Sequence, residues 1–146
     1  MSGQLAGRTI LVVGAGTQPS DDEDAPVGNG RAIAVSAARE GAHVVCADRD
    51  ERAAGETARL VGDAGGVATV AVGDVRAEND CAALVAAAVA AGDGTVHGVV
   101  LNVGIGRGSG LAATTAEDWD LTFAVNLRGH FLVAREAAPH VPRGGA

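Results

Sequence analysis

The chain has 146 residues, the length of one domain, and 47% of them are apolar, which excludes a disordered chain and suffices for a core. Its net charge of −7 makes nucleic acids and anionic membranes poor partners, because both select clustered positive charge, so a small molecule is the expected partner. The N-terminus lacks a signal-peptide pattern and no apolar run approaches the roughly 20 residues of a membrane span, which predicts a cytoplasmic protein.

Short apolar runs alternate with Ala-rich segments of helical pattern along the whole chain. This order predicts an α/β fold, a Rossmann-type doubly wound parallel sheet of about four strands in the order 3-2-1-4. The fourth strand is then an edge strand with unpaired backbone groups. We expect residues 1–146 to form a single domain. The predicted strands are Thr9–Val13, Val44–Ala47, Val67–Val72 and Gly98–Leu101, and the predicted helices are Gly30–Glu40, Glu51–Val61, Asn79–Ala90 and Ala116–Ala138.

The two cysteines lie far apart in the sequence. Cys46 falls in the second predicted strand and Cys81 near the start of a helix, without CxxC spacing. Both are predicted to be buried, reduced thiols, and the sequence predicts no metal site.

A glycine-rich turn follows the first predicted strand. Gly14 ends the strand, and Gly28, Asn29 and Gly30 begin the first predicted helix. In a βαβ unit such a turn binds the pyrophosphate of a dinucleotide, because the helix N-terminus offers free N–H groups and the positive end of the helix dipole. We therefore predict that these four residues bind a dinucleotide cofactor.

Residues 15–27 form an acidic insertion inside this turn. Two prolines, Pro19 and Pro26, make a helix or a central strand improbable there, so the segment is expected to loop outward. A solvated surface loop is the favoured interpretation, since runs of charge usually stay in water. The alternative is a lid or a metal-assisted contact to the cofactor. The acidic run consists of Asp21, Asp22, Glu23 and Asp24.

Two charged residues follow the second predicted strand. An acidic residue at this point can accept hydrogen bonds from the adenine ribose hydroxyls, and Asp48 is the candidate. Its charge disfavours a 2′-phosphate, which predicts NAD as the cofactor. Arg49 directly after it could pair with a 2′-phosphate, so NADP remains an alternative.

Several motifs, taken in chain order, resemble those of the short-chain dehydrogenase/reductase family, and the resemblance covers essentially the whole chain. The family's TGxxxGxG motif is matched by the three glycines named above, with Val13 in place of Thr and ten extra residues between the first two glycines. The "GDV" after the third predicted strand matches another family motif. The resemblance implies that Asp74 and Val75 contact the adenine ring.

The second half of the chain continues the resemblance. "LNVG" from Leu101 is similar to the family's NNAG segment, which implies that Asn102 and Gly104 shape the inner wall of the cofactor site. The last predicted helix resembles the family's long fourth helix. Asn126 stands where the family places an Asn that kinks this helix and holds a water of the proton relay.

Large apolar side chains recur every four residues along this helix. Such spacing places them on one helical face, and a packing stripe within the domain is the favoured interpretation. Because this helix often meets a partner subunit in the family, which is commonly homo-oligomeric, an interface is the alternative. The residues are Trp119, Phe123, Leu127 and Phe131.

The chain contains no Tyr and no Lys. In the family a Tyr passes a proton to or from the substrate oxygen, and a Lys four residues later lowers the pKa of that Tyr. The resemblance thus implies an NAD(P)-dependent oxidoreductase acting on a small alcohol or carbonyl compound, present here as an N-terminal portion inactive by itself. A non-catalytic dinucleotide-binding module is the alternative. A methyltransferase is a weaker rival, because the motifs named above argue against it.

Overall fold

The computed structural model describes residues 3–18, 20–21 and 24–146, and it arranges them around one parallel sheet. The strands β1 (Thr9–Val13), β2 (His43–Asp48), β3 (Val67–Val72) and β4 (Gly98–Leu101) lie in the order β3-β2-β1-β4. This confirms the predicted fold class and strand order. The only difference in bounds is at β2, which is one residue longer at each end than predicted.

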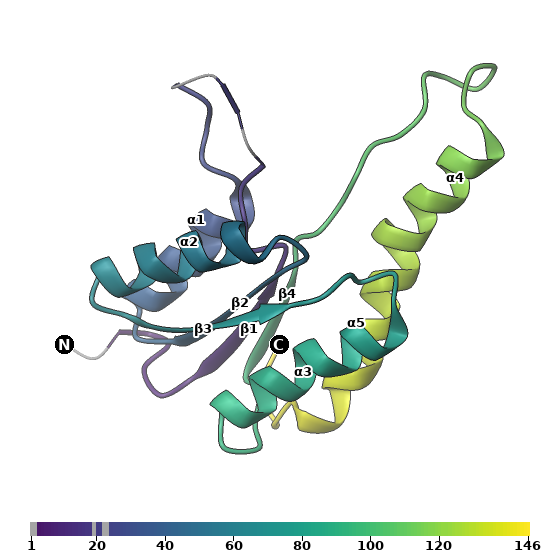
Figure 1. The fold of residues 1–146 in the computed structure, drawn as a ribbon. Coiled ribbons are helices and arrows are strands. Elements are labelled where there is room, and N and C mark those ends of the chain that lie inside the picture. The colour runs from purple at the N-terminus through teal and green to yellow at the C-terminus, as the bar shows by residue number, and fades with distance from the viewer. Residues whose placement is uncertain (1–2, 19, 22–23) are drawn as a thin grey trace.

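Helices cover both faces of the sheet. Figure 1 shows α1 (Asn29–Arg39) and α2 (Glu51–Asp63) on one side of it, and α3 (Glu78–Ala91) and α5 (His130–Ala137) on the other. The first three helices agree with the predicted ones to within two residues at each end. None of the helices in the described part of the chain is both long and apolar enough to cross a membrane.

The core consists of two layers, because successive residues of a strand point to opposite faces. Leu11 packs in the layer under α3 and α5, whereas Val12 packs in the layer under α1 and α2. Cys46 lies in the second layer and Cys81 in the first. Both thiols are free and fully buried, as predicted, and burial raises the pKa of Cys46 to about 11.

Strand β3 is less covered than the two central strands. Val67 and Val72 are 59% and 48% exposed, whereas every residue of β1 is buried. The difference follows from position, because β1 and β2 have neighbouring strands on each side and β3 ends the sheet.

At the opposite edge, the C-terminal residue pairs with β4. The backbone of Ala146 donates to the carbonyl oxygen of His97 at 3.0 Å, and its carbonyl oxygen accepts from the N–H of Val99 at 2.9 Å. The expectation that this edge has unpaired backbone groups is therefore wrong at this position, because the chain returns to β4 after α5.

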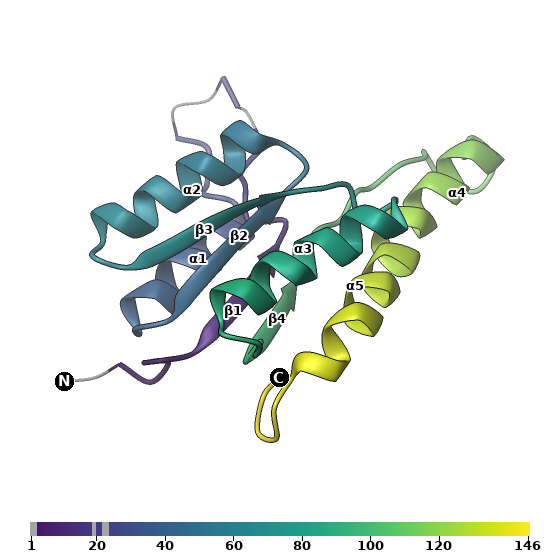
Figure 2. The same cartoon turned by 60° about the horizontal axis from the view of Figure 1, so that its bottom comes forward.

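The last long helix changes its winding halfway. It begins as α4 (Ala116–Phe123), continues as the π-helix η1 (Ala124–Gly129) and then as α5, and it ends in the 3-10 turn η2 (Ala138–His140). The Thr115 hydroxyl caps α4 by accepting from the N–H of Asp118 at 3.0 Å. Figures 1 and 2 show that α4 projects beyond the sheet, and it has no buried residue.

The apolar stripe on this helix is exposed. Trp119, Leu127 and Phe131 are each about 60% exposed, and Phe123 is 41% exposed. The favoured prediction of a packing stripe within the domain is therefore wrong. Trp119 and Phe123 do lie together, with their rings stacked, but all four side chains are exposed and do not pack on the sheet.

Candidate functional site

A pocket of about 390 Å³ opens where the carboxyl ends of all four strands meet. Its walls come from the ends of β1 and β2, from the segments that follow the four strands, from the start of α1 and from Val125 of η1. The chain crosses from β1 to β2 on one side and reaches β4 on the other, so the pocket lies at the point where the strand order reverses. Ligands of doubly wound sheets bind in this crevice.

The pocket brings together all but one of the predicted cofactor-binding residues. The exception is Gly30, which is buried at the start of α1, behind the pocket wall. The predicted residues that line it are Gly14, Gly28, Asn29, Asp48, Arg49, Asp74, Val75, Asn102 and Gly104.

Gly14 and Gly30 let two backbones approach each other at the base of the pocket. Gly14 has φ +81°, and a Cβ there would lie 2.8 Å from the backbone nitrogen of Val103. A Cβ on Gly30 would lie 1.8 Å from the carbonyl oxygen of Gly14, so any side chain would push α1 away. The side chain of Asn102 donates to this same carbonyl at 3.0 Å and so joins the turns after β1 and β4.

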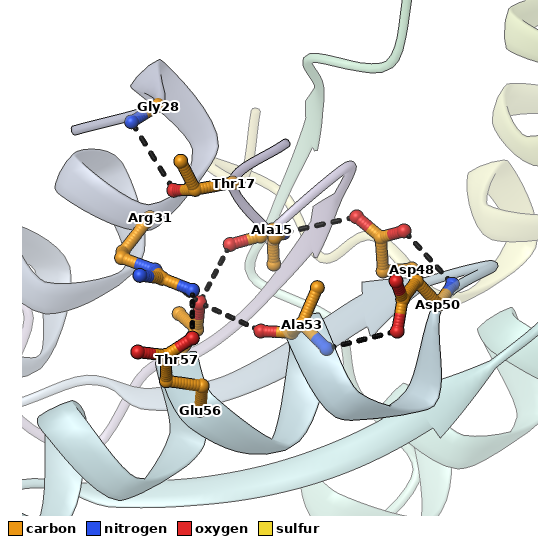
Figure 3. Close-up of polar contacts among 10 residues, drawn as sticks. Ala15, Thr17, Gly28, Arg31, Asp48, Asp50, Ala53, Glu56 and Thr57 are labelled. Carbon is orange, nitrogen blue, oxygen red and sulfur yellow. Dashed lines mark hydrogen bonds and ion pairs between the residues drawn. The ribbon is translucent and has the colours of Figure 1, made fainter. Parts of the chain in front are cut away.

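Asp48 is the last residue of β2, and backbone donors orient its carboxylate. Oδ2 accepts from the N–H of Gly16 at 2.9 Å, and Oδ1 accepts from the N–H of Asp50 at 3.0 Å (Figure 3). The side chain of Asp50 in turn caps α2 by accepting from the N–H of Ala53 at 3.1 Å. Each carboxylate oxygen can accept a second hydrogen bond, so Asp48 can still bind a ligand hydroxyl.

The sequence-based prediction missed Gly16 and Thr17, which also line the pocket. A Cβ on Gly16 would lie 2.8 Å from Oδ2 of Asp48, so glycine permits this contact. The hydroxyl of Thr17 accepts from the N–H of Gly28 at 3.2 Å. The sequence signal for Gly16 is its place two residues after Gly14, although Gly28 and Gly30 are the glycines that match the family motif.

The hydrogen bond between Thr17 and Gly28 joins the two ends of the acidic insertion. Figure 1 shows that the described residues of the insertion project away from the sheet beside the start of α1. Its described residues Ser20, Asp21 and Asp24 are exposed, and Gln18 lines the pocket. The predicted acidic residues Asp22 and Glu23, together with Pro19, lie outside the described residues.

Asp74 and Arg76 form an ion pair at the wall after β3. The guanidinium Nε donates to Oδ2 of Asp74 at 2.9 Å, and this hydrogen bond holds the pKa of the carboxyl below its usual value. The positive charge of Arg49 lowers the same pKa further. Val75, the next residue, is buried against the layer under α3.

Asn126 lies in the π-helix η1 and reaches the pocket through a neighbour. Its Oδ1 accepts from the N–H of Ile105 and its Nδ2 donates to the carbonyl of Ile105, both at 2.8 Å. Asn126 itself does not line the pocket, whereas Gly104 and Ile105 do. Single π turns inside helices often occur at functional sites.

The known proteins that this chain resembles are dehydrogenases and reductases. A family model described as enoyl-(acyl carrier protein) reductase matches residues 26–146. A short-chain type dehydrogenase/reductase from Picea abies is 38% identical over 151 residues, which cover 97% of this chain. The hydroxyacyl-CoA dehydrogenase ChsB1 of Mycobacterium tuberculosis is 36% identical over 141 residues, or 93% of this chain.

A solved structure shares the arrangement of the whole sheet. The crystal structure of a short-chain dehydrogenase/reductase from Burkholderia xenovorans superposes with a TM-score of 0.85 at 38% identity and covers 94% of this chain. Only 52% of that protein is matched, and the matches span 51% of the Picea abies protein and 41% of the M. tuberculosis protein. The chain thus spans about half the length of these relatives.

Proposed function

Because the chain belongs to the short-chain dehydrogenase/reductase family of oxidoreductases, we propose that its pocket binds NAD. Membership of the family rests on the comparison with known proteins. The choice of cofactor rests on one observation, the carboxylate of Asp48 held at the pocket wall by two backbone N–H groups.

The start of α1 fits the pyrophosphate of this cofactor. No described side chain caps α1 at its N-terminus, so its first N–H groups remain for an anionic ligand. A Cβ on Gly28 would lie 2.9 Å from the Thr17 hydroxyl, so glycine keeps this approach open. Asn29 at the start of the helix would therefore hold the pyrophosphate and Gly28 would let it approach, while Gly14 and Gly30 seat the helix behind it.

The wall formed by β2 and β3 would hold the adenosine half. Asp48 would accept the ribose hydroxyls, and Val75 and Asp74 would lie against the adenine. A 2′-phosphate would meet the negative charge of Asp48, which favours NAD over NADP. Arg49 could offset this repulsion, but its charge is shared with Asp74, whose pKa it lowers.

The nicotinamide half would lie toward Asn102, Gly104 and Ile105. When bound, the cofactor supplies a carbon that gives or takes a hydride, with a small alcohol or carbonyl compound as the proposed partner. Asn126 would keep Ile105 in place at this end through its two hydrogen bonds.

We propose further that the 146 residues bind the cofactor without completing the reaction by themselves. Proton transfer to the substrate oxygen requires a side chain of suitable pKa. The chain has no Tyr and no Lys, the two residue types that its family resemblance would require. The same observation supports the second candidate, a dinucleotide-binding module without catalysis.

Calorimetric titration of the chain with NAD and with NADP tests the proposed cofactor. We expect NAD to bind more tightly. Asp48→Ala should weaken NAD about tenfold or more, since hydrogen bonds to charged groups contribute about 1.5–3 kcal/mol. NADP should bind the variant as well as the wild type or better.

Asp63→Ala is the control, because it removes the same charge from an exposed position that does not line the pocket. It should leave both affinities unchanged. If NADP bound the wild type as tightly as NAD did, the proposed preference would be wrong. If neither cofactor bound, the proposed function itself would fail.

A further inference from the structure

We infer that Thr57, a residue of α2 outside the pocket, is a positioning residue that sets the cofactor preference by fixing the Ala15–Gly16 peptide. This inference rests on the proposed function, because it concerns how the pocket presents Asp48 to a ribose. No predicted site residue and no motif of the sequence includes Thr57.

Thr57 is completely buried and its hydroxyl lies between three groups. It donates toward the carbonyl of Ala15 at 2.9 Å, and the carbonyl of Ala53, one turn earlier in α2, lies 3.2 Å away. Arg31 of α1 donates to it from Nε at 3.0 Å. Figure 3 shows these contacts meeting at the hydroxyl, beside the turn that carries Ala15.

Arg31 determines where the hydroxyl proton can go. A guanidinium has donors and no acceptor, so the proton of Thr57 cannot point toward it. The proton must go to a backbone carbonyl, and that of Ala15 is the nearer one. Arg31 is itself held by an ion pair with Glu56 at 3.0 Å, and its side chain is only 13% exposed.

The Ala15–Gly16 peptide carries this constraint to Asp48. The carbonyl that Thr57 binds and the N–H that Asp48 binds belong to one peptide group. A trans peptide is planar and rigid, and its C=O and N–H point in opposite directions. Fixing the carbonyl on the α2 side therefore aims the N–H of Gly16 at Oδ2 of Asp48.

Without this constraint the peptide has freedom to rotate. Gly16 has no Cβ, and glycine accepts backbone conformations closed to other residues. A rotated peptide would turn the Ala15 carbonyl toward the carboxylate of Asp48, placing two acceptors against each other. Asp48 would then lose one of the two donors that orient it, and its selectivity for the ribose hydroxyls would fall.

Thr57→Val tests this inference, because valine keeps the shape of the side chain and removes the hydroxyl. In titrations of the full 146-residue chain, we expect the ratio of NAD to NADP affinity to fall about fivefold to tenfold, the effect of one hydrogen bond. Thr57→Ser, which keeps the hydroxyl, should restore the ratio to within twofold. A simple loss of stability would weaken both cofactors alike and leave the ratio unchanged.

A second measurement does not depend on cofactor binding. The amide proton of Gly16 donates to a carboxylate, so its NMR resonance in the ligand-free protein should move upfield in Thr57→Val and return in Thr57→Ser. Thr69→Val is the matched control, since it loses a hydroxyl contact to His43 at 2.8 Å but does not line the pocket. It should change neither the resonance nor the ratio.

Should Thr57→Val fail to fold, the double variant Arg31→Met with Thr57→Val removes the buried donor together with its acceptor, a change that is often tolerated. It should show the same two effects. The inference would be overturned if the Gly16 resonance of the variant did not change. It would also be overturned if the wild type bound NAD and the variant had the same ratio of NAD to NADP affinity. If the wild type bound neither cofactor, the proposed function would fail and the effect on cofactor preference would fail with it, whereas the Gly16 resonance would still decide whether Thr57 fixes the Ala15–Gly16 peptide.

Discussion

Asp48 and Asp74 lie on the same pocket wall, but their carboxylates have different partners. Asp48 is held by backbone N–H groups, which orient it without neutralising its charge. Asp74 is paired with Arg76. Of these two carboxylates, Asp48 is the one whose charge no ion pair offsets, which is why this residue rather than Asp74 should discriminate against a 2′-phosphate.

Arg76→Gln should raise the pKa of Asp74 toward the usual value of about 3.9. The hydrogen bond from Arg76 is the largest cause that lowers this pKa in the folded protein. The ion pair thus stabilises the fold above the unfolded pKa, and this contribution is lost as the pH falls through the folded pKa. NMR titration of the side-chain carboxyl carbons measures the change directly.

The carboxyl of Asp74 in the wild type should titrate below the range of an ordinary Asp. Between pH 5 and 8 the difference in free energy of unfolding between Arg76→Gln and the wild type should not depend on pH. Arg59→Gln removes another exposed ion pair, with Asp63, and serves as the control. An Asp74 pKa that did not change in Arg76→Gln would contradict the assignment of the shift to this pair.

Some residues of the site could be predicted from sequence and others could not. Gly14 and Asp48 stand at strand ends, where the βαβ order gives each position a role. The sequence marks Gly16 as a glycine of the turn but not its partner Asp48, 32 residues away, and Thr57 acts through a contact 42 residues away in the sequence. A threonine inside an Ala-rich helix carries no local sign that its hydroxyl reaches a distant carbonyl, so only the packing of α2 against the turn reveals it.

At the scale of elements, the two ends of the acidic insertion lie close together at the glycine turn. Thr17 and Gly28 are joined by a hydrogen bond, so the chain leaves and re-enters the turn at one place. Such a loop can vary in length with little strain on the turn beneath it, because the entropic cost of loop closure depends weakly on length.

Deleting residues 18–26 should therefore leave NAD affinity unchanged or slightly improved, since Thr17 and Gly28 remain. Deleting residues 17–26 removes the bond to Gly28 as well and should weaken binding about fivefold, the effect of one hydrogen bond. Titration of both variants compares the two cases. Loss of NAD binding in the shorter deletion, or a requirement for a divalent ion in the wild type, would instead support the lid.

The helices and strands themselves were predictable because their order repeats. Each predicted strand appears in the structure, since short apolar runs between polar turns have few other ways to be buried in a parallel sheet. The π-helix η1 was not predicted as such. Its residues, Ala124–Gly129, have no composition that separates them from an α-helix, and only the family resemblance suggested a kink at Asn126.

At the scale of the molecule, the aromatic side chains lie outside the core. Trp119 and Phe123 are exposed on α4 and Phe131 is exposed on α5, whereas the core consists mainly of Ala, Val and Leu. Trp119 stacks on Phe123 with ring centroids 4.6 Å apart, and Arg135 lies 5.7 Å from the ring centroid of Phe131. An exposed apolar stripe on a projecting helix is typical of a surface that associates with another protein.

We predict that the chain self-associates through this stripe and that its stability as a monomer is low, below about 5 kcal/mol. Leu127→Glu with Phe131→Glu should shift the chain toward monomer, because charge would then have to be buried on association. Light scattering together with thermal melting measures both properties. Ala83→Glu with Ala86→Glu adds the same charge to exposed positions of α3 and should not change the assembly.

A monodisperse wild-type monomer with a sharp melt would contradict this prediction. Sequence periodicity could not decide the matter, since a stripe at four-residue spacing looks the same whether its helix packs on the sheet or projects from it. Whether the stripe is buried or exposed depends on the position of α4 relative to the sheet. That position depends on the connecting residues 102–115, which have no regular secondary structure.

The two buried cysteines allow the sheet to be observed one face at a time. Cys46 lies in the layer under α1 and α2, and Cys81 lies in the layer under α3 and α5. Because both thiols are fully buried, a thiol reagent can reach either of them only when its own layer opens. Labelling Cys46 in a variant that lacks Cys81 would thus report the opening of the layer under α1 and α2. Labelling Cys81 in a variant that lacks Cys46 would report the opening of the layer under α3 and α5.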